Sequence, residues 1–277
     1  MQEIHSKLLT YAYNIVGSYE DAKDVVQDVT LKYLTIDKKN IRNEANFLIK
    51  SVVNQAINFK NKHRKKENFG EWLPEPVSFD NAETQLVKEQ TLNYTLLVLL
   101  ENLGPKERAV FILKEGFSYS HKEIAELLDI TTENSRQILR RSSKELKKLN
   151  RDLDGFALNN HTETIQKYQT ALSEINIQAL ENLLVEDIRL TADKGQKIQV
   201  VKAVETGKNA TATLLTYVWQ RFLTGKKHSF HTFNHRPAIC FWQDGRVYNC
   251  HIFQLDPIGK IQQIFSIVDP KKLKNIF

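Results

Sequence analysis

The segment 117–141 constrains the fold more than any other part of the chain, because it encodes two helices separated by a tight break. Ser120 is followed three residues later by Glu123, a capping box that marks the beginning of a helix. Apolar residues then recur on one helical face, at Ile124, Ala125, Leu127 and Leu128. The break at 129–131 ends this helix, and a threonine there can cap the next one. The pattern predicts a helix-turn-helix.

The second helix of this motif carries cations on one side. Arg136, Arg140 and Lys144 recur every fourth residue and therefore share one outward stripe. A positive stripe on a capped helix suits the major groove of DNA. Arginine and lysine pair with guanine, while asparagine and glutamine pair with adenine. The residues expected to contact DNA are Asn134, Ser135, Arg136, Gln137, Arg140, Arg141 and Lys144.

The composition describes an ordinary globular protein with two or three small domains. The chain has 277 residues, of which 41% are hydrophobic and 26% are charged. No apolar run is long enough to span a bilayer, and no signal-peptide core is found, so we expect a cytoplasmic protein that does not bind membranes. The net charge of +6 fits a polyanionic partner, although only weakly.

Local charge is more informative than the total. One basic cluster comprises Lys60, Lys62, Arg64, Lys65 and Lys66, and the second comprises Arg136, Arg140, Arg141, Lys144, Lys147 and Lys148. A single cluster of this kind is usually a solvated helix face. Two clusters on either side of a linker, one of them within a helix-turn-helix, favour contacts with DNA phosphates. An acidic patch forms a contrast, at Glu20, Asp21, Asp24 and Asp28.

Periodicity divides the chain into three folded parts joined by one linker. Residues 1–66 and 86–150 have helical patterns, whereas 67–85 contains glycine and prolines that exclude a long helix. This linker also holds large apolar groups, namely Phe69, Trp72, Leu73, Val77 and Phe79, so we expect it to dock on a protein surface.

After about residue 155 the pattern changes to a mixture of helices and strands. Asp244-Gly245 is a strong two-residue hairpin turn. The residues predict an α+β domain over 156–277 with a curved antiparallel sheet. Its expected helices are 162–173, 177–185 and 210–223, and its expected strands are 187–192, 198–203, 228–234, 238–243, 246–255 and 260–268.

Several stretches of the chain carry a resemblance to a known family. Residues 9–17 and 21–28 resemble region 2 of the extracytoplasmic-function sigma factors of the sigma-70 family, and 103–111 with the helix-turn-helix resembles their region 4. The C-terminal part is similar to SnoaL-like cone domains, which the SigJ-like type carries as an extension. The linker signature matches at Trp72-Leu73-Pro74-Glu75-Pro76. The tail signature is approximated by Asp269-Pro270-Lys271-Lys272-Leu273, while Asp193-Lys194-Gly195-Gln196 matches a third signature poorly.

The resemblance implies a multidomain fold and a set of partners. Two all-α sigma domains, region 2 over 1–66 and region 4 over 86–150, would precede the SnoaL-like domain. Region 2 would bind the β′ clamp helices of the RNA polymerase core, and region 4 would bind its β flap and promoter DNA. The expected polymerase contacts lie on the outer face of the acidic helix, at Asp21, Asp24, Gln27, Asp28 and Leu31. Asp24 and Asp28 repel each other at this spacing, which makes sense if a basic partner docks there.

A sigma factor must also capture single-stranded bases at the −10 element, which requires a base pocket and cations along the backbone. The expected contacts lie in the loop after the acidic helix and on the next helix, at Asn40, Arg42, Asn43, Lys50, Asn54, Asn58 and Lys62. These asparagines could equally be loop and capping residues.

The C-terminal domain is expected to regulate the other two through an intramolecular contact, with its sign left open. The residues expected to transmit this regulation lie in the linker and the tail, at Trp72, Leu73, Pro74, Glu75, Pro76, Asp269, Pro270 and Leu273. Two alternatives remain open: a ligand-sensing helix-turn-helix regulator that acts without polymerase, and a SnoaL-like enzyme with a DNA-binding appendage. An acid–base-lined pocket would favour the enzyme.

We expect no catalytic residue, cofactor or metal site. His228, His231, His235 and His251 are more typical of structural residues than of catalytic ones. The two cysteines are expected to be separate buried thiols: a regular hairpin would place Cys240 opposite Asn249, with Cys250 on the other side of the sheet.

Overall fold

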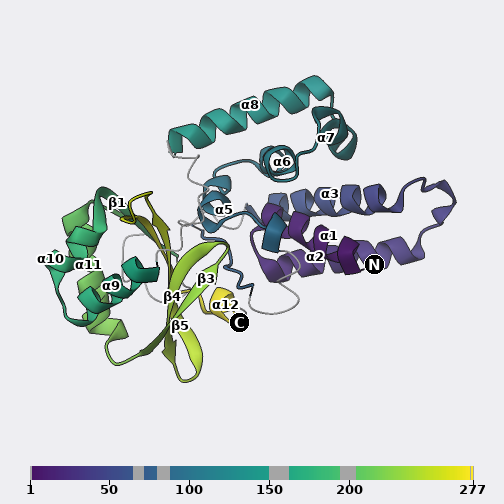
Figure 1. Ribbon diagram of the computed structural model, residues 1–277. Coiled ribbons are helices and arrows are strands. Elements are labelled where there is room, and N and C mark those ends of the chain that lie inside the picture. Colours follow the sequence, from purple (N-terminus) through teal and green to yellow (C-terminus); the bar gives the residue numbers. More distant parts are fainter. Residues whose placement is uncertain are drawn as a thin grey trace. The chain divides into compact units, whose positions relative to one another are not determined.

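The computed structural model describes residues 2–64, 72–79, 88–149, 162–193, 204–274 and 276 (Figure 1). The chain forms two compact units. The first unit comprises 1–68 and 79–153, and the second comprises 69–78 and 154–277. The segments expected as two separate sigma domains therefore belong to one unit. Most of the described linker residues belong to the other unit, together with the C-terminal domain.

The first three helices of the first unit pack against one another. They are α1 (Gln2–Val16), α2 (Tyr19–Thr35) and α3 (Glu44–Arg64), with a 3₁₀ turn at Lys38–Asn40. Gly17 has a φ of 85°, which permits the sharp turn between α1 and α2, and Ser18 then caps α2 by accepting a bond from the Asp21 amide. The face of α2 predicted to be apolar is buried, at Ala22, Val25, Val26, Val29 and Tyr33.

The helix-turn-helix lies in the second half of this unit, as predicted. A 3₁₀ turn (Lys88–Gln90), α5 (Tyr94–Leu100), α6 (Pro105–Phe111) and a π-helical turn (Ile112–Gly116) precede α7 (His121–Leu128) and α8 (Thr132–Leu149). The Ser120 hydroxyl accepts from the Glu123 amide at 3.2 Å, and the Ser120 amide donates to the Glu123 carboxylate at 2.7 Å. Asp129 ends α7 with a left-handed φ of 50°. Helix α8 packs on α6 and α7.

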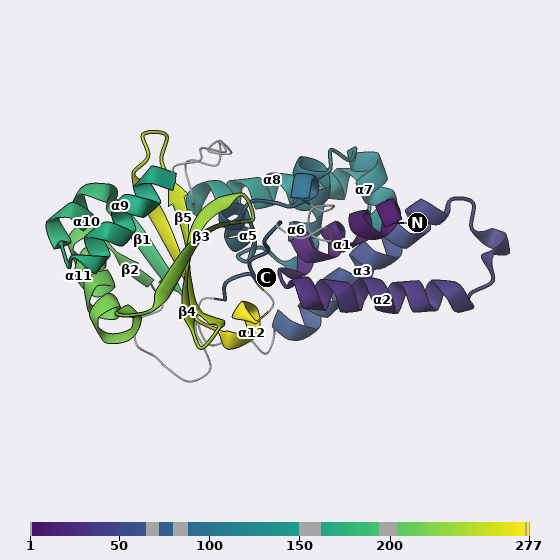
Figure 2. The same cartoon turned by 60° about the horizontal axis from the view of Figure 1, so that its bottom comes forward.

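The second unit is a mixed sheet covered by helices on one face. Its helices are α9 (Thr162–Ser173), α10 (Ile177–Leu183), α11 (Lys208–Val218), a π-helical turn (Trp219–Leu223) and α12 (Pro270–Leu273). The strands lie in the order β2-β1-β6-β5-β4-β3. Their bounds are β1 (Leu184–Ala192), β2 (Val204–Thr206), β3 (Lys227–Phe233), β4 (Arg236–Gln243), β5 (Arg246–Leu255) and β6 (Ile261–Ile267). Figures 1 and 2 show α9–α11 on one side of β4 and β5 and α12 on the other side.

The expected α+β class is confirmed, but the sheet is not wholly antiparallel. Strands β1 and β6 pair in parallel, because the chain passes through β2, α11 and β3–β5 before it returns beside β1. The expected strand at 198–203 lies outside the described residues. The core between sheet and helices is apolar and includes Tyr168, Leu190, Trp219, Phe241 and Phe253.

The register predicted for the two cysteines is wrong, whereas their predicted burial is confirmed. The Asp244-Gly245 turn forms, and Gln243 faces Arg246 as expected. One extra residue in β5 then shifts the register between Phe241 and Trp242, so that Cys240 lies directly opposite Cys250. Both thiols are buried. The two cysteines are cross-strand neighbours on the same face of the sheet rather than separate groups.

No described helix combines the length and the apolar character that crossing a bilayer requires.

Candidate nucleic-acid and polymerase interfaces

The outer face of α2 is acidic and open to solvent. Asp24, Gln27 and Asp28 are exposed, and Asp21 is half-buried near the beginning of the helix. Leu31 continues this face and leaves 55% of its surface exposed. The opposite face of α2 packs into the core, so the helix presents its carboxylates together with Leu31 and Leu34 outward. This arrangement suits a basic partner with an apolar contact.

In the loop before α3, only some of the residues expected to contact the −10 element have exposed side chains. Arg42 is exposed, and the Asn43 side chain caps α3 by accepting from the Asn46 amide at 3.0 Å. Asn43 therefore has the capping role that its residue type also allowed. The side chain of Asn40 lies outside the described residues. Phe47 is partly exposed beside Tyr33, with ring centroids 6.0 Å apart.

Lys50 and Asn54 contact the helix-turn-helix, and both are half-exposed. The Lys50 ammonium donates to the Glu126 carbonyl at 3.1 Å and to the Asp129 carboxylate at 2.7 Å. The Asn54 amide donates to the Leu127 carbonyl at 3.0 Å. The acceptors belong to the last turn of α7, where carbonyls lack partners within the helix. Two residues expected to bind promoter DNA thus bind region 4 in this structure.

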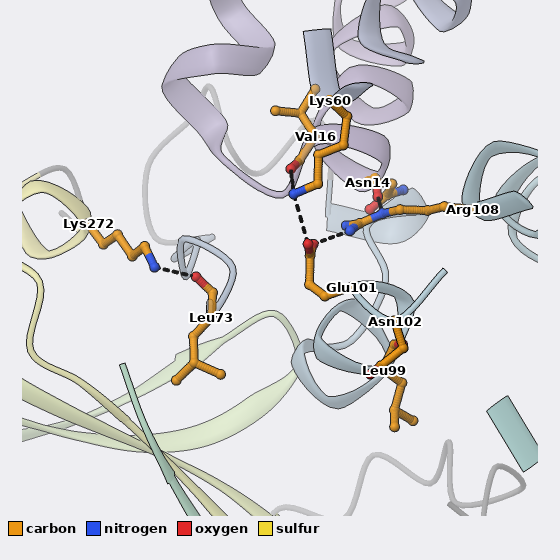
Figure 3. A network of polar contacts seen from close by, with 9 residues as sticks. All are labelled: Asn14, Val16, Lys60, Leu73, Leu99, Glu101, Asn102, Arg108 and Lys272. Atoms are coloured by element: carbon orange, nitrogen blue, oxygen red, sulfur yellow. Dashed lines mark hydrogen bonds and ion pairs between the residues drawn. The ribbon is translucent and has the colours of Figure 1, made fainter. Parts of the chain in front are cut away.

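Lys60 is a second exception, since it was counted in a basic cluster but is buried. Its ammonium donates to the Val16 carbonyl at 3.0 Å and pairs with Glu101 at 2.8 Å (Figure 3). Arg108 also pairs with Glu101 and donates to the Asn14 carbonyl at 2.8 Å. The half-buried carboxylate of Glu101, at the end of α5, thereby joins cations and carbonyls of α1, α3 and α6. Asn58 and Lys62 remain exposed, while Lys65 and Lys66 lie outside the described residues.

Other contacts between the two halves of this unit surround the Glu101 network. The Asn14 side chain donates to the Gln90 carbonyl at 3.0 Å and accepts from the Leu92 amide at 3.2 Å. The Tyr11 and Tyr119 hydroxyls are 2.8 Å apart. Burial, together with this hydrogen bond, raises the pKa of Tyr11. The halves are held by polar groups in a protected interface, where unmade bonds are costly.

The outer stripe of α8 is arranged as predicted, with one correction. Arg136, Gln137, Arg140, Arg141 and Lys144 are exposed, and Asn134 is half-exposed at the first turn. Ser135 is fully buried, and its hydroxyl lies 2.9 Å from His121 Nδ1, so it holds α8 against α7 and does not reach DNA. Burial, helped by Lys114 and Arg136, lowers the pKa of His121. The remaining residues form a cationic ridge on the exposed side of α8.

Comparisons with known proteins agree with this geometry. The family described as Sigma-70 region 2 matches residues 1–66, and the family described as Sigma-70, region 4 matches 95–146. The chain therefore carries both regions, 2 and 4, of a sigma-70 factor. It is 25% identical over 231 residues to the extracytoplasmic-function RNA polymerase sigma factor SigJ of Mycobacterium tuberculosis, covering 81% of this chain and 73% of that protein.

Two further likenesses concern the same group. The probable sigma factor SigI of Mycobacterium tuberculosis is 23% identical over 145 residues, or half of each chain. The crystal structure of Mycobacterium tuberculosis SigJ superposes with a TM-score of 0.79 and 22% identity, over all of this chain and 98% of that one. The fold therefore agrees along its whole length. The sigma factor directs RNA polymerase to promoters, and the other two interpretations are not favoured.

The linker of the sigma factor is anchored by a residue that the sequence argument did not select. Lys272 of α12 is buried, and its ammonium donates to the Leu73 carbonyl at 2.6 Å (Figure 3) and to the Asp193 carboxylate at 2.8 Å. Its charge also lies 4.6 Å from the centre of the Trp72 ring. The linker signature, the tail signature and the first residue of the poorly matching signature thus meet at one lysine. The presence of all three motifs in one chain was the sequence signal that could have indicated a contact between them.

The other linker and tail residues support this anchor. Leu73, Pro74, Glu75 and Pro76 are buried. The Val77 amide donates to the Asn234 side chain at 2.8 Å, which fixes the linker to the β3–β4 turn. Asp269 caps α12 by accepting from the Lys271 amide, Pro270 begins that helix, and Leu273 is buried. The linker and α12 form one structure, which we call the linker–tail clasp: residues 72–78 and 269–273.

The space between sheet and helices in the C-terminal domain of the sigma factor is filled with side chains. His251 lies there, fully buried, with its Nδ1 3.0 Å from the Tyr168 hydroxyl. Burial lowers the pKa of His251 to about 4, so the ring is neutral at neutral pH. Phe241 and Phe253 pack around it. This apolar interior therefore gives the enzymatic interpretation no support.

Two other histidines of this domain lie on β3, the edge strand of the sheet. His228 is exposed on β3, and His231 Nε2 lies 2.7 Å from the Ser229 hydroxyl. The Trp242 indole donates to the same hydroxyl at 2.6 Å. No metal-binding group of three histidine, cysteine or carboxylate side chains occurs among the described residues.

Proposed function

We propose that this sigma factor is closed when it is alone, and that the polymerase core opens it for promoter recognition. The observation that carries the proposal is that Lys50 and Asn54, which are expected to bind DNA, are bonded to α7 in this structure. Both lie on the helix that the family resemblance assigns to the −10 strand, and both donate to the last turn of α7. They are unable to hold DNA phosphates and region 4 at once. Promoter binding by region 2 therefore requires α3 and α7 to separate.

The acidic face of α2 is the proposed docking surface for the polymerase core. Asp21, Asp24, Gln27, Asp28 and Leu31 would contact the β′ clamp helices. Repulsion between the like charges at Asp24 and Asp28 weakens the free helix by a few tenths of a kcal/mol, and a basic partner relieves it. Region 4 would contact the β flap. Because the protein acts on RNA polymerase, its proposed location is the cytoplasm.

Region 4 is proposed to read the −35 duplex through the exposed part of α8. Arg136 and Gln137 lie near the beginning of the helix, where a recognition helix contacts base edges. Arg140, Arg141 and Lys144 lie further along and suit phosphates. Asn134 completes this set. Ser135 is excluded from it, because its hydroxyl is committed to His121.

Region 2 is proposed to hold the melted −10 strand. Arg42, Asn58 and Lys62 are available in the closed form, since all three are exposed. Lys50 and Asn54 would join them after opening. The partly exposed Phe47, next to Tyr33, offers a stacking surface for a base. Asn40 and Asn43 would shape the loop around that base.

The C-terminal domain is proposed to bias the closed and open forms through the linker–tail clasp. Because residues 72–78 connect region 2 to region 4, fixing them limits how far those regions separate. Removing residues after 155 should change promoter output. Removing only 269–277 releases the linker from Lys272 while it keeps the sheet. The two truncations should change promoter output in opposite directions if the domain both restrains and positions the sigma regions.

The test is reconstitution with the polymerase core and a promoter that contains −10 and −35 elements. Charge reversal at Asp24 and Asp28 (Asp24→Lys with Asp28→Lys) should lower the affinity for core at least ten-fold. Glu174→Lys combined with Glu181→Lys makes the same change in net charge on exposed or half-exposed positions of the other unit and serves as the control. Equal core affinity in both double variants contradicts the proposal.

A further inference from the structure

The register of the β4–β5 hairpin creates a dithiol. Without the irregularity, Cys240 and Cys250 would point to opposite faces of the sheet. The extra residue in β5 brings them directly opposite each other on adjacent strands. Facing residues of an antiparallel pair have Cα atoms about 4.5–5.5 Å apart, and disulfides span Cα separations of about 4.4–6.8 Å. The backbone is therefore already placed for a disulfide.

The two sulfur atoms also interact in the reduced protein. Burial and a hydrogen bond with the Cys240 thiol raise the pKa of Cys250. That hydrogen bond requires the thiols to point toward each other, which facing positions alone do not guarantee. The chain has only these two cysteines, so any thiol oxidation involves this pair or a second molecule.

The dithiol lies on the sheet face away from α9–α11. Ile239, Phe241 and Phe253 belong to the core beneath those helices. Because side chains alternate along a strand, Cys240 and Cys250 face the other way. On that side α12 contacts β5, and Lys272 of α12 holds the linker at the Leu73 carbonyl. The linker–tail clasp therefore packs on the face that carries the thiols.

We propose that Cys240 and Cys250 form a redox site. A peroxide oxidises the two thiols to a reversible intramolecular disulfide, and the linker–tail clasp limits the rate of this oxidation. One thiolate attacks the peroxide oxygen and becomes a sulfenic acid, with hydroxide or an alkoxide as the leaving group. The second thiol then attacks that sulfur and releases water. For hydrogen peroxide, two thiols and one peroxide give one disulfide and two waters. Two small thiols reduce the bond again and are oxidised to their own disulfide.

Burial makes this reaction conditional on an opening of the structure. A thiol in an apolar environment stays protonated and meets little peroxide, so the closed site should react slowly. Release of the linker–tail clasp would expose the sheet face and allow the thiols to ionise. Whatever loosens the bond between Lys272 and Asp193 should therefore accelerate oxidation.

The experiment exposes the reduced full-length protein to hydrogen peroxide, stops the reaction, and alkylates the remaining thiols in denaturant. Intact mass and peptide mapping should show that both thiols disappear together, as a Cys240–Cys250 disulfide in a monomer, and that dithiothreitol restores both. Cys240→Ser and Cys250→Ser should each abolish this product. Independent oxidation of the two thiols to sulfinic acids, a disulfide between chains, or two alkylated thiols after prolonged exposure would overturn the proposal.

The role of the clasp has its own matched pair of variants. Lys272→Met removes the buried charge, and Lys271→Met makes the same change at the exposed neighbour. Oxidation should be at least five-fold faster in Lys272→Met than in Lys271→Met. Equal rates in the two folded proteins would overturn the gating. If Lys272→Met does not fold, Asp193→Asn weakens the same ion pair while it keeps the shape of the side chain, and the same two outcomes apply.

Discussion

Two buried lysines hold this sigma factor together in similar ways, but in different electrostatic settings. Lys60 in the first unit and Lys272 in the second each pair with a carboxylate at 2.8 Å. Each also donates to a backbone carbonyl, of Val16 and of Leu73 respectively. Lys60 shares Glu101 with the buried Arg108, whereas the described ion pair of Lys272 is with Asp193 alone.

The Lys60 and Lys272 sites differ in the residue on which the stability of each depends most. The Glu101 network holds two cations around one carboxylate, so Glu101 is the residue it needs most. At the Lys272 site, the loss of either partner breaks the ion pair with Asp193 and leaves the other member of that pair buried. Buried groups that lose an ionic partner are much more destabilised than exposed ones. The comparison therefore gives an order of effects, which begins at Glu101 and ends at the exposed Lys50–Asp129 contact.

The largest effect is expected from Glu101→Gln. This change leaves Lys60 and Arg108 buried without a carboxylate, and the arginine does not release its proton. We expect the free energy of unfolding of the first unit to fall by about 3–5 kcal/mol. Urea unfolding followed by circular dichroism measures the loss. Glu174→Gln, at an exposed position, is the control, and a loss no greater than in that variant would contradict the proposed importance of Glu101.

A smaller loss is expected from Lys272→Met in the second unit. Asp193 stays buried without the ammonium, but its carboxyl group can take up a proton, which limits the cost. We expect the second unit to lose about 2–3 kcal/mol in its free energy of unfolding. Limited proteolysis should cut the linker faster than in Lys271→Met. Protection of the linker equal to that control would show that the lysine does not anchor it.

Lys60→Met should cost less than either change, although the lysine is equally buried. Arg108 still pairs with Glu101, and the methionine side chain fills a similar volume, so we expect a loss of about 1–2 kcal/mol. The measurement is the same urea unfolding. A loss as large as that of Glu101→Gln would mean that the two cations do not share the carboxylate, which would remove the basis of the comparison.

The smallest effect on stability belongs to Asp129→Asn, because the Lys50–Asp129 pair is largely exposed. Asparagine also tolerates the left-handed backbone of this residue. The variant should free Lys50, and the isolated protein should bind single-stranded −10 DNA about two- to five-fold more tightly. Fluorescence anisotropy checks this, with Lys50→Ala expected to weaken binding. If neither Asp129→Asn nor a further variant, Asp129→Gly, binds the DNA more tightly, the proposed closed form is contradicted.

The sequence predicted most of the helices correctly because their signals are local. The capping box at Ser120, the apolar stripe of α2 and the turn at Asp244-Gly245 each lie within a few residues, and all of them form. The α+β class of the C-terminal domain followed from similar local patterns. The parallel pairing of β1 with β6 did not, since it depends on segments about seventy residues apart.

The site predictions failed where charge or residue type did not reveal burial. Lys60 has the same sequence environment as the exposed Lys62, but only Lys60 faces Glu101 of a distant helix. Ser135 lies between residues of the exposed stripe and yet points toward His121. The cysteine prediction assumed a regular hairpin, and a single extra residue in β5 reversed it. None of these contacts has a signature within its own segment.

The order of the strands sets the limits for shortening this protein from its C-terminus. Strand β6 lies in the middle of the sheet, with β1 and β2 on one side and β5, β4 and β3 on the other. A chain that stops before Asp269 loses α12 but retains every described strand. One that stops before Ile261 loses the strand that joins both halves, and its C-terminal domain should fall apart. Among the described strands, the last to be synthesised is thus the one that completes the domain.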